Sequence, residues 1–160
     1  LEIAFERADT LLSKPSKTYL IDYKVITENQ GKYFVINYWP EDKYLNPGHL
    51  PGSMQYTPKK ALLTTTDLST LPTDQPIAVY CFTGQHRATV VAYLKMLGYD
   101  AYSVKFGSNA FINETLIQTE KKAGHYWSDI HKNNLPLSTA AQPAADDAPA
   151  VEIKSVQGGC

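Results

Sequence analysis

A short apolar segment that ends at a cysteine, followed by a polar loop and a longer apolar segment, constrains the fold of this chain most. Residues 77–80 are isoleucine, alanine, valine and tyrosine, and prolines precede them, which is typical of a short buried strand. Residues 88–97 are mainly apolar and stop at Gly98, as a helix with a glycine C-cap does. The sequence therefore predicts a strand, a tight loop and a helix, with Cys81 at the tip of the strand.

The position of Cys81 makes its thiol a candidate nucleophile. Backbone N–H groups of the loop and of the first helical turn have no intrahelical partners, and a helix N-terminus carries roughly half a positive charge. Both features, with a cation close by, favour the thiolate near neutral pH. A glycine in the loop lets the backbone turn its N–H groups inward around an anion. We therefore expect a nucleophilic sulfur inside an anion-binding loop. The loop residues are Phe82, Thr83, Gly84, Gln85, His86 and Arg87.

Each of the two key side chains also has a structural interpretation. A cysteine at a strand end can be a small apolar core residue. Arg87 can be a solvated residue of the first helical turn, although a cation there opposes the helix dipole unless an anion offsets it. The combination of Cys81, the glycine-containing loop and Arg87 favours the reactive site.

Composition excludes several classes of function. The formal net charge is −1 over 160 residues, so no basic stripe indicates nucleic acid or an anionic membrane surface. No apolar run approaches the ~20 residues of a membrane span. Cys81 and Cys160 are the two cysteines and lie far apart, without paired histidines. This pattern predicts neither a disulfide framework nor a metal site, and no cofactor is expected.

The order of the other predicted elements indicates an α/β domain. Strands and helices alternate along the chain, which is typical of a parallel sheet with helices packed on it. His49 lies between two Pro-Gly pairs and is expected to be a turn residue whose ring bonds the neighbouring backbone. The predicted elements are a helix over Leu1–Leu12, a strand over Tyr19–Ile21, a helix from the N-cap Asp22 to about Asn29, strands over Tyr33–Ile36 and Ser53–Tyr56, a short helix over Lys59–Leu63, a strand over Asp100–Val104 and a helix over Glu114–His131.

We divide the chain into three segments: a helix in residues 1–17, a folded domain in residues 18–132 and an Ala/Pro-rich tail in residues 133–160. The tail is expected to be a flexible linker. Residues 151–156 alternate apolar and charged types, as an edge strand does. Cys160 is either a tail thiol without a role, which is the simpler interpretation, or a thiol that exchanges sulfur with the strand-tip cysteine.

The chain begins with a leucine rather than a methionine. A cleaved export signal would explain this and would place the protein in the periplasm. A cytoplasmic protein is the alternative.

Three stretches of the sequence resemble the rhodanese (thiosulfate sulfurtransferase) family in order and spacing. They are residues 34–39, residues 48–53 and residues 79–87, which continue to residue 100. The resemblance implies a small, single, doubly wound domain with a central, mostly parallel sheet of about five strands and helices on both faces. It also implies sulfane sulfur transfer, in which Cys81 accepts sulfur from thiosulfate, a polysulfide or a persulfide. The resulting Cys81 persulfide then passes the sulfur to cyanide, a thiol or a protein acceptor.

The chain departs from many family members after the second predicted strand. Residues 37–39 are Asn-Tyr-Trp, where many members have Asp-x-Arg. We expect Tyr38, Trp39 and Phe82 to form an aromatic rim around the site. Such a rim would suit a larger or less anionic sulfur carrier than thiosulfate.

Two alternatives of other classes remain open. Many members carry an arginine where this chain has His86, with Arg87 one step later. Cys81 and Arg87 therefore satisfy Cys-x5-Arg, the spacing of the related dual-specificity phosphatases and arsenate reductases, whose arginine holds an oxyanion. The second alternative is a non-catalytic rhodanese-like module that docks a partner, against which the presence of the cysteine argues.

Overall fold

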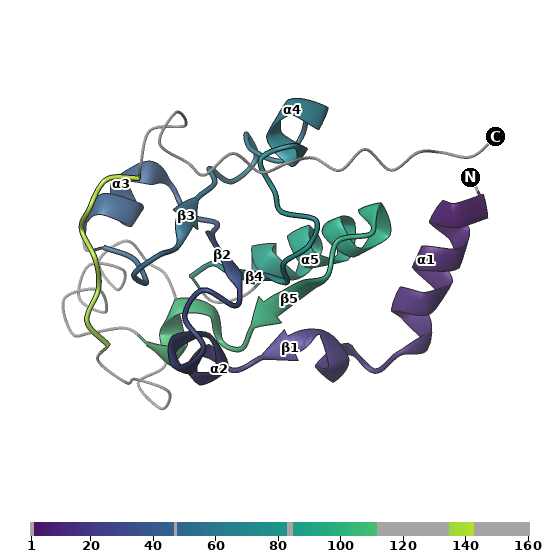
Figure 1. Cartoon of the computed structure of the whole chain (residues 1–160), viewed down its shortest axis with the longest axis horizontal. Helices are drawn as coiled ribbons and strands as arrows, with labels where there is room; N and C mark the ends of the chain where they lie inside the picture. The colour runs from purple at the N-terminus through teal and green to yellow at the C-terminus, as the bar shows by residue number, and fades with distance from the viewer. Residues whose placement is uncertain (1, 47, 83–84, 112–134, 143–160) are drawn as a thin grey trace.

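The computed structural model describes residues 2–46, 48–82, 85–111 and 135–142. Within them, five parallel strands form one sheet in the order β1-β5-β4-β2-β3. The expected α/β fold with a parallel five-stranded sheet is therefore confirmed (Figure 1). The strands are β1 (Leu20–Ile21), β2 (Phe34–Asn37), β3 (Met54–Gln55), β4 (Ile77–Tyr80) and β5 (Ala101–Val104).

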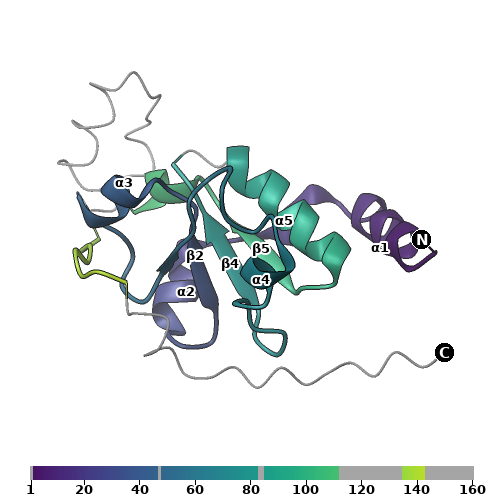
Figure 2. The ribbon, with the colours of Figure 1, turned by 90° about the horizontal axis from the view of Figure 1, so that it is seen from above.

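Helices surround this sheet, and α1 and α3 lie at opposite ends of the molecule in both views (Figures 1 and 2). The α-helices are α1 (Glu2–Ser13), α2 (Tyr23–Glu28), α3 (Glu41–Leu45), α4 (Thr65–Leu68) and α5 (Gln85–Leu97). Two 3-10 helices are η1 (Ser16–Tyr19) and η2 (Gly107–Ala110). Among the described helices, none has the length and apolar character of a membrane span.

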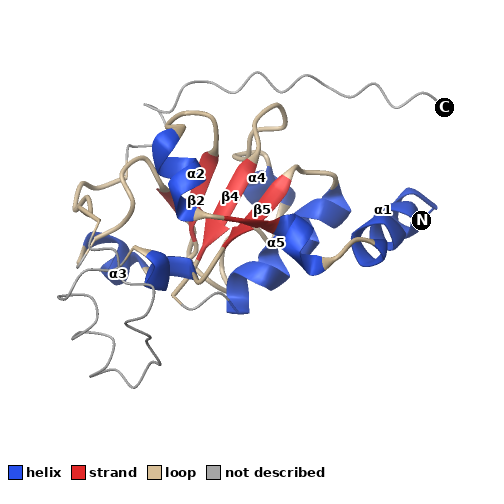
Figure 3. Ribbon diagram, turned by 90° about the horizontal axis from the view of Figure 1, so that it is seen from below, coloured by secondary structure: helices blue, strands red, loops and turns tan. Residues whose placement is uncertain are grey.

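Strand β4 lies at the centre of the sheet and is fully buried (Figure 3). Its residues alternate between the two faces, as strand geometry requires. Ile77 and Val79 pack in the cluster that contains the α5 residue Leu94. Ala78 and Tyr80 pack in the cluster that contains the α2 residue Ile26. Burial on both faces explains why this strand is a continuous apolar run rather than an alternating one.

Helix α5 follows the cysteine and ends as predicted at Gly98, which has a φ of +100°. The N–H of Tyr99 donates to the Leu94 carbonyl, and the N–H of Gly98 donates to the Lys95 carbonyl, both at 3.0 Å. These two bonds form a Schellman motif, which satisfies the last carbonyls of the helix. The sequence therefore fixes the end of α5 through one glycine.

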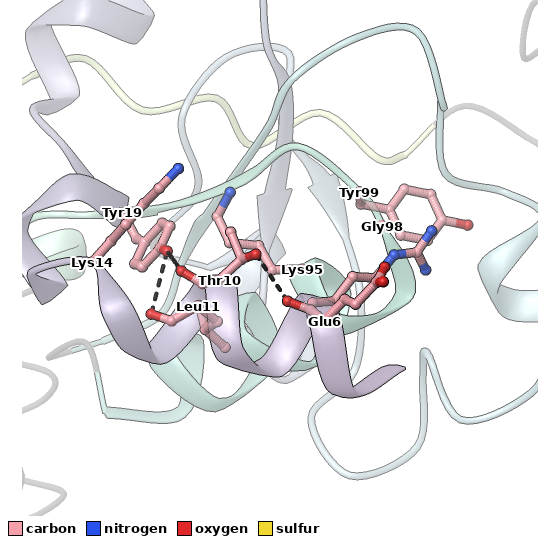
Figure 4. Close-up of a pocket in the computed structure, with 9 residues that line it drawn as sticks. Glu6, Thr10, Leu11, Lys14, Tyr19, Lys95, Gly98 and Tyr99 are labelled. Atoms are coloured by element: carbon pink, nitrogen blue, oxygen red, sulfur yellow. Dashed lines mark hydrogen bonds between the residues drawn. The ribbon is translucent and has the colours of Figure 1, made fainter. Parts of the chain in front are cut away.

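Helix α1 packs against α5 at the end distant from Cys81 and has no buried residues. A pocket of about 380 Å³ lies between them, with Lys14 and Lys95 on its wall (Figure 4). The Tyr19 hydroxyl donates to carbonyls of α1, at 3.2 Å to Thr10 and 3.3 Å to Leu11. The predicted N-terminal helix is therefore present, but it lies on the surface of the domain.

Two predictions for the connection between β2 and β4 differ from the structure. The helix predicted over Lys59–Leu63 is wrong, because Lys59 and Leu62 have left-handed φ angles of 63° and 65° and the segment forms turns. A helix begins later, at α4, where Thr64 and Asp67 form a reciprocal capping box. Helix α3 was not predicted, although proline followed by two acidic residues is a typical helix start.

The start of the tail is also corrected. Residues 135–142 lie on the domain rather than forming a flexible linker, and Leu135 and Leu137 pack against the α2-side core. Ser138 forms an antiparallel bridge with His49, with N–H to carbonyl distances of 2.9 and 2.8 Å. The two leucines bury apolar surface, which composition-based reasoning about the tail overlooked. The predicted helix over Glu114–His131, the predicted strand over 151–156 and Cys160 lie outside the described residues.

Candidate active site at the carboxyl edge of the sheet

Cys81 directly follows β4 at the carboxyl edge of the parallel sheet, where open α/β folds bind ligands. The residue is buried, with 3% of its surface exposed. Helix α5 begins four residues later, at Gln85. The predicted sequence of strand, cysteine, loop and helix is therefore present. Thr83 and Gly84 lie outside the described residues, so the expected ring of loop amides stays a prediction.

Arg87 lies in the first turn of α5 and is buried, with 8% of its surface exposed. Its Nε donates a hydrogen bond to the hydroxyl of Ser103 on β5. Its Nη1 is buried and has no hydrogen-bond partner among the described residues. Burial lowers the pKa of Arg87, and the electrostatic interaction with Cys81 opposes that shift. Arg87 is therefore not the solvated residue that the structural interpretation required, and it interacts electrostatically with the candidate nucleophile.

A buried hydrogen-bond network centred on Tyr80 supports the residue before the cysteine. The Tyr80 hydroxyl accepts from the Asn37 side-chain amide at 2.8 Å and from the Leu50 N–H at 3.1 Å. The Ser53 hydroxyl, 3.1 Å away, donates its own proton to the Leu50 carbonyl at 2.8 Å. By elimination, the Tyr80 proton points to Ser53. Burial raises the pKa of Tyr80, so this hydroxyl stays neutral.

The network connects residues 48–53 to β4, because Leu50 and Ser53 contact the Tyr80 hydroxyl. This loop turns at Gly48 and Gly52, which have φ angles of +117° and +78°. His49 is buried, its Nδ1 lies 2.7 Å from the Tyr44 carbonyl, and its ring stacks on the Tyr44 ring with centroids 3.5 Å apart. The prediction that the ring of His49 bonds the neighbouring backbone is confirmed, but His49 itself forms a bridge with Ser138 and the turn follows at residues 51 and 52. The loop buttresses β4 through the Tyr80 hydroxyl.

Trp39 does not fit the predicted open aromatic rim, and a rim of Tyr38 and Phe82 stays a prediction. Trp39 is fully buried, so it does not line an open rim. Its ring stacks on Phe82 with centroids 4.5 Å apart and contacts Tyr80 edge-on at 5.8 Å. Phe82 and Tyr38 are half-buried, and the Tyr38 hydroxyl accepts from the Lys59 N–H at 3.1 Å. His86 is exposed and does not join the buried group of Cys81 and Arg87.

Buried polar atoms without partners concentrate at this edge of the sheet. Within the described residues they are Asn37 Oδ1, Trp39 Nε1 and Arg87 Nη1. Asn37 ends β2, Trp39 follows it by two residues, and Arg87 contacts β5, which lies on the other side of β4. Most buried polar groups in native proteins have partners, so these three atoms are unusual among the described residues.

Several residues of the site were not predicted from the sequence. Ser103, Ser53 and Ser108 contact site residues only because the fold brings distant segments together. Their signal in the sequence is weak, since single serines at strand ends and turns are common. No cluster of three or more potential metal ligands occurs in the part of the chain that the structure describes.

The fold and the site together define an α/β domain with a cysteine at the tip of its central strand. A family model for the rhodanese-like domain matches residues 14–114. The chain therefore belongs to the rhodanese-like domain family, and the resemblance stated above is confirmed. No curated protein matches the sequence.

Solved structures are similar at low identity. A rhodanese-related protein from Thermoplasma volcanium is 22% identical, covering 66% of this chain and 93% of its own, with a TM-score of 0.46. A protein from Lactobacillus plantarum is 20% identical, covering 64% and 87%, with a TM-score of 0.46. A protein of unknown function from Rhodopseudomonas palustris, described as a possible tyrosine phosphatase, is 11% identical, covering 78% and 93%, with a TM-score of 0.44. Likenesses at this level carry no argument about activity.

Proposed function

We propose that this protein is a sulfurtransferase that carries sulfane sulfur on Cys81. With thiosulfate as donor, the Cys81 thiolate attacks the outer sulfur, the sulfur–sulfur bond of thiosulfate breaks, and sulfite leaves with the bonding electron pair. Cyanide or a thiolate then attacks the terminal sulfur of the Cys81 persulfide and regenerates the thiolate. Polysulfides and persulfides are donors of the same kind, and a protein thiol is an acceptor of the same kind. No general acid is needed, because each leaving group is already an anion.

The observation that carries this proposal is the electrostatic environment of Arg87. A buried cation at a helix N-terminus is unfavourable by itself, because the helix dipole and desolvation both oppose it. Arg87 nevertheless lies there, interacting with Cys81, and its Nη1 has no partner among the residues that the structure describes. An anion at Cys81 removes the conflict. The thiolate, the persulfide and the departing sulfite are all anions, so the same position stabilises each stage of the reaction.

The test is intact mass spectrometry after exposure to thiosulfate or polysulfide, followed by treatment with cyanide. We expect the protein to gain the mass of one sulfur atom and to lose it as thiocyanate forms. Cys81→Ser should abolish the gain with every donor. Cys160→Ser is the matched control, because it also removes one thiol but should leave the gain intact. Turnover retained in Cys81→Ser would remove this cysteine from the mechanism, and no mass gain at Cys81 would favour a non-catalytic module.

A phosphatase or arsenate reductase is the second candidate, and the same arginine favours it. Cys81 and Arg87 have the Cys-x5-Arg spacing, and Arg87 is buried and interacts electrostatically with the cysteine. Hydrolysis of an aryl phosphate and reduction of arsenate should be measured beside sulfur transfer on one preparation. Appreciable hydrolysis or arsenate reduction without transfer would reverse the ranking.

A further inference from the structure

The turn after β5 contacts the backbone of the candidate site. Ser108, in η2, is fully buried. Its N–H donates to the Cys81 carbonyl at 2.9 Å, and its hydroxyl donates to the Phe82 carbonyl at 3.0 Å. One serine therefore holds two consecutive carbonyl groups, beginning at the candidate nucleophile.

Gly107 makes this approach possible. It has a φ of +57°, and a Cβ at this position would lie 2.3 Å from the Cys81 carbonyl oxygen and 2.8 Å from that of Phe82. The preceding residue, Phe106, has a φ of 60°, a left-handed conformation that costs a non-glycine residue roughly 1 kcal/mol. The chain adopts a strained turn that brings Ser108 onto the two carbonyls.

Peptide geometry connects these carbonyls to the site. In a trans peptide group, the carbonyl and the following N–H point in opposite directions. Because the Cys81 carbonyl accepts from Ser108, the Phe82 N–H points away from η2, and the bond to the Phe82 carbonyl anchors the same residue a second time. An anion requires amide hydrogens around it, and a flipped peptide would present a carbonyl oxygen instead.

We propose that Ser108 is a positioning residue for sulfur transfer, which holds the backbone on both sides of Phe82 so that the Phe82 N–H faces the Cys81 sulfur. This inference rests on the proposed function for its purpose. It does not depend on sulfur transfer for its test, because the same amide stabilises the bare thiolate before any donor binds.

The experiment measures how readily Cys81 forms its thiolate. In a Cys160→Ser background Cys81 is the sole cysteine of the chain, so the rate of iodoacetamide alkylation against pH reports its thiolate fraction. We expect Ser108→Ala to move the midpoint of that profile upward by on the order of one pH unit, because the thiolate loses an oriented amide. Ser108→Thr keeps the hydroxyl and should restore the midpoint.

Two further variants separate positioning from general stability. Tyr99→Phe, beyond the other end of α5, also removes a hydroxyl that donates to a carbonyl, that of Leu68 at 3.0 Å, but it should leave the midpoint unchanged while lowering stability. Gly107→Ala presses a methyl group against the two carbonyls that Ser108 holds and should raise the midpoint by a second route. If Ser108→Ala does not fold, the midpoint of Gly107→Ala tests the positioning role in its place.

The outcomes distinguish this inference from the proposed function. An unchanged midpoint in folded Ser108→Ala would overturn the positioning role, even if the wild-type protein gains sulfur. If Ser108→Ala does not fold, an unchanged midpoint in Gly107→Ala has the same meaning. A raised midpoint in a protein that never gains sulfur would support amide positioning and refute the sulfurtransferase. A raised midpoint together with a fall in the sulfur-transfer rate, roughly tenfold or more, is the result we expect.

Discussion

The two ends of helix α5 both carry cations, but their environments are opposite. At the C-terminal end, Arg7 donates to the Met96 carbonyl at 3.2 Å, and Lys95 lies 3.7 Å from Asp100 and over two tyrosine rings. These cations face a helix terminus whose dipole attracts them. At the N-terminal end, Arg87 is buried against the dipole, and its Nη1 has no partner within the described part of the chain.

The difference separates charges that contribute to packing from a charge that the proposed function uses. The cations at the C-terminal end are each engaged by groups of the protein. The cation at the N-terminal end opposes the helix dipole, and an anion beside it would stabilise it. Stable proteins keep such conflicts chiefly at sites where a ligand or a reaction resolves them.

The largest effect should come from replacing Arg87. Arg87→Met removes the cation but keeps much of the side-chain volume, and we expect sulfur transfer from thiosulfate to fall by about 10²-fold or more, because an anion-stabilising group is lost. The free energy of unfolding should change by no more than about 1 kcal/mol, since the variant also removes a buried charge. Steady-state kinetics and urea unfolding measure the two quantities.

Arg7→Met is the matched control at the other end of the helix. It removes a cation of the same type, yet it should leave the transfer rate at the wild-type level, because Arg7 contacts the α5 C-terminus. Equal losses of activity in the two variants would contradict the distinction between the two ends.

Tyr80→Phe should give the next largest effect, this time on stability. The change keeps the ring in the core but leaves the Asn37 amide and the Leu50 N–H without their acceptor. We expect a loss of about 2 kcal/mol in the free energy of unfolding, because buried donors without partners are costly. Tyr93→Phe is the control, at a more exposed tyrosine of α5, and it should change stability little. A similar loss of stability in Tyr93→Phe would mean that the network around the Tyr80 hydroxyl has no special contribution.

The sequence predicted the central unit well because its signals are local. The apolar run of β4, the cysteine at its tip and the glycine that ends α5 each act through neighbouring residues. The N-cap role of Asp22 is confirmed in the same way, since its side chain accepts from the Lys24 N–H. Such features follow from backbone geometry and need no knowledge of the fold.

The sequence failed where distant segments meet. It could not show that Ser103 contacts Arg87 or that Ser108 holds the site backbone, because these contacts span 16 and 26 or more residues. It placed Trp39 on an open rim, whereas packing against Phe82 and Tyr80 buries it. It also treated residues 135–142 as a linker, although two leucines and a backbone bridge attach them to the domain.

The free energy of unfolding should depend on pH through His49. Burial lowers the pKa of His49 below its usual 6.5, and the bond to the Tyr44 carbonyl opposes this only partly. The unfolded chain therefore binds more protons than the folded chain as pH falls below about 6.5, and stability decreases in that range. His49 contributes at most about 1.4 kcal/mol per pH unit to the slope of the unfolding free energy against pH.

The slope can be assigned with a histidine variant. His49→Gln should flatten the dependence of the unfolding free energy on pH between about 6.5 and 5. Urea unfolding at several pH values gives the slopes. A wild-type slope that survives in His49→Gln would assign the pH dependence to another group.

The smallest effect should be the contribution of Arg7 to stability. Its guanidinium is exposed and caps a carbonyl that water can reach, so Arg7→Met should cost about 0.5 kcal/mol at low salt. At 1 M NaCl the Debye length falls to about 3 Å, and the electrostatic part of that cost should shrink. Urea unfolding of both proteins at the two salt concentrations measures it. A loss above about 2 kcal/mol that salt does not change would mean that Arg7 is a packing residue, because an exposed charge at a helix terminus cannot supply that much.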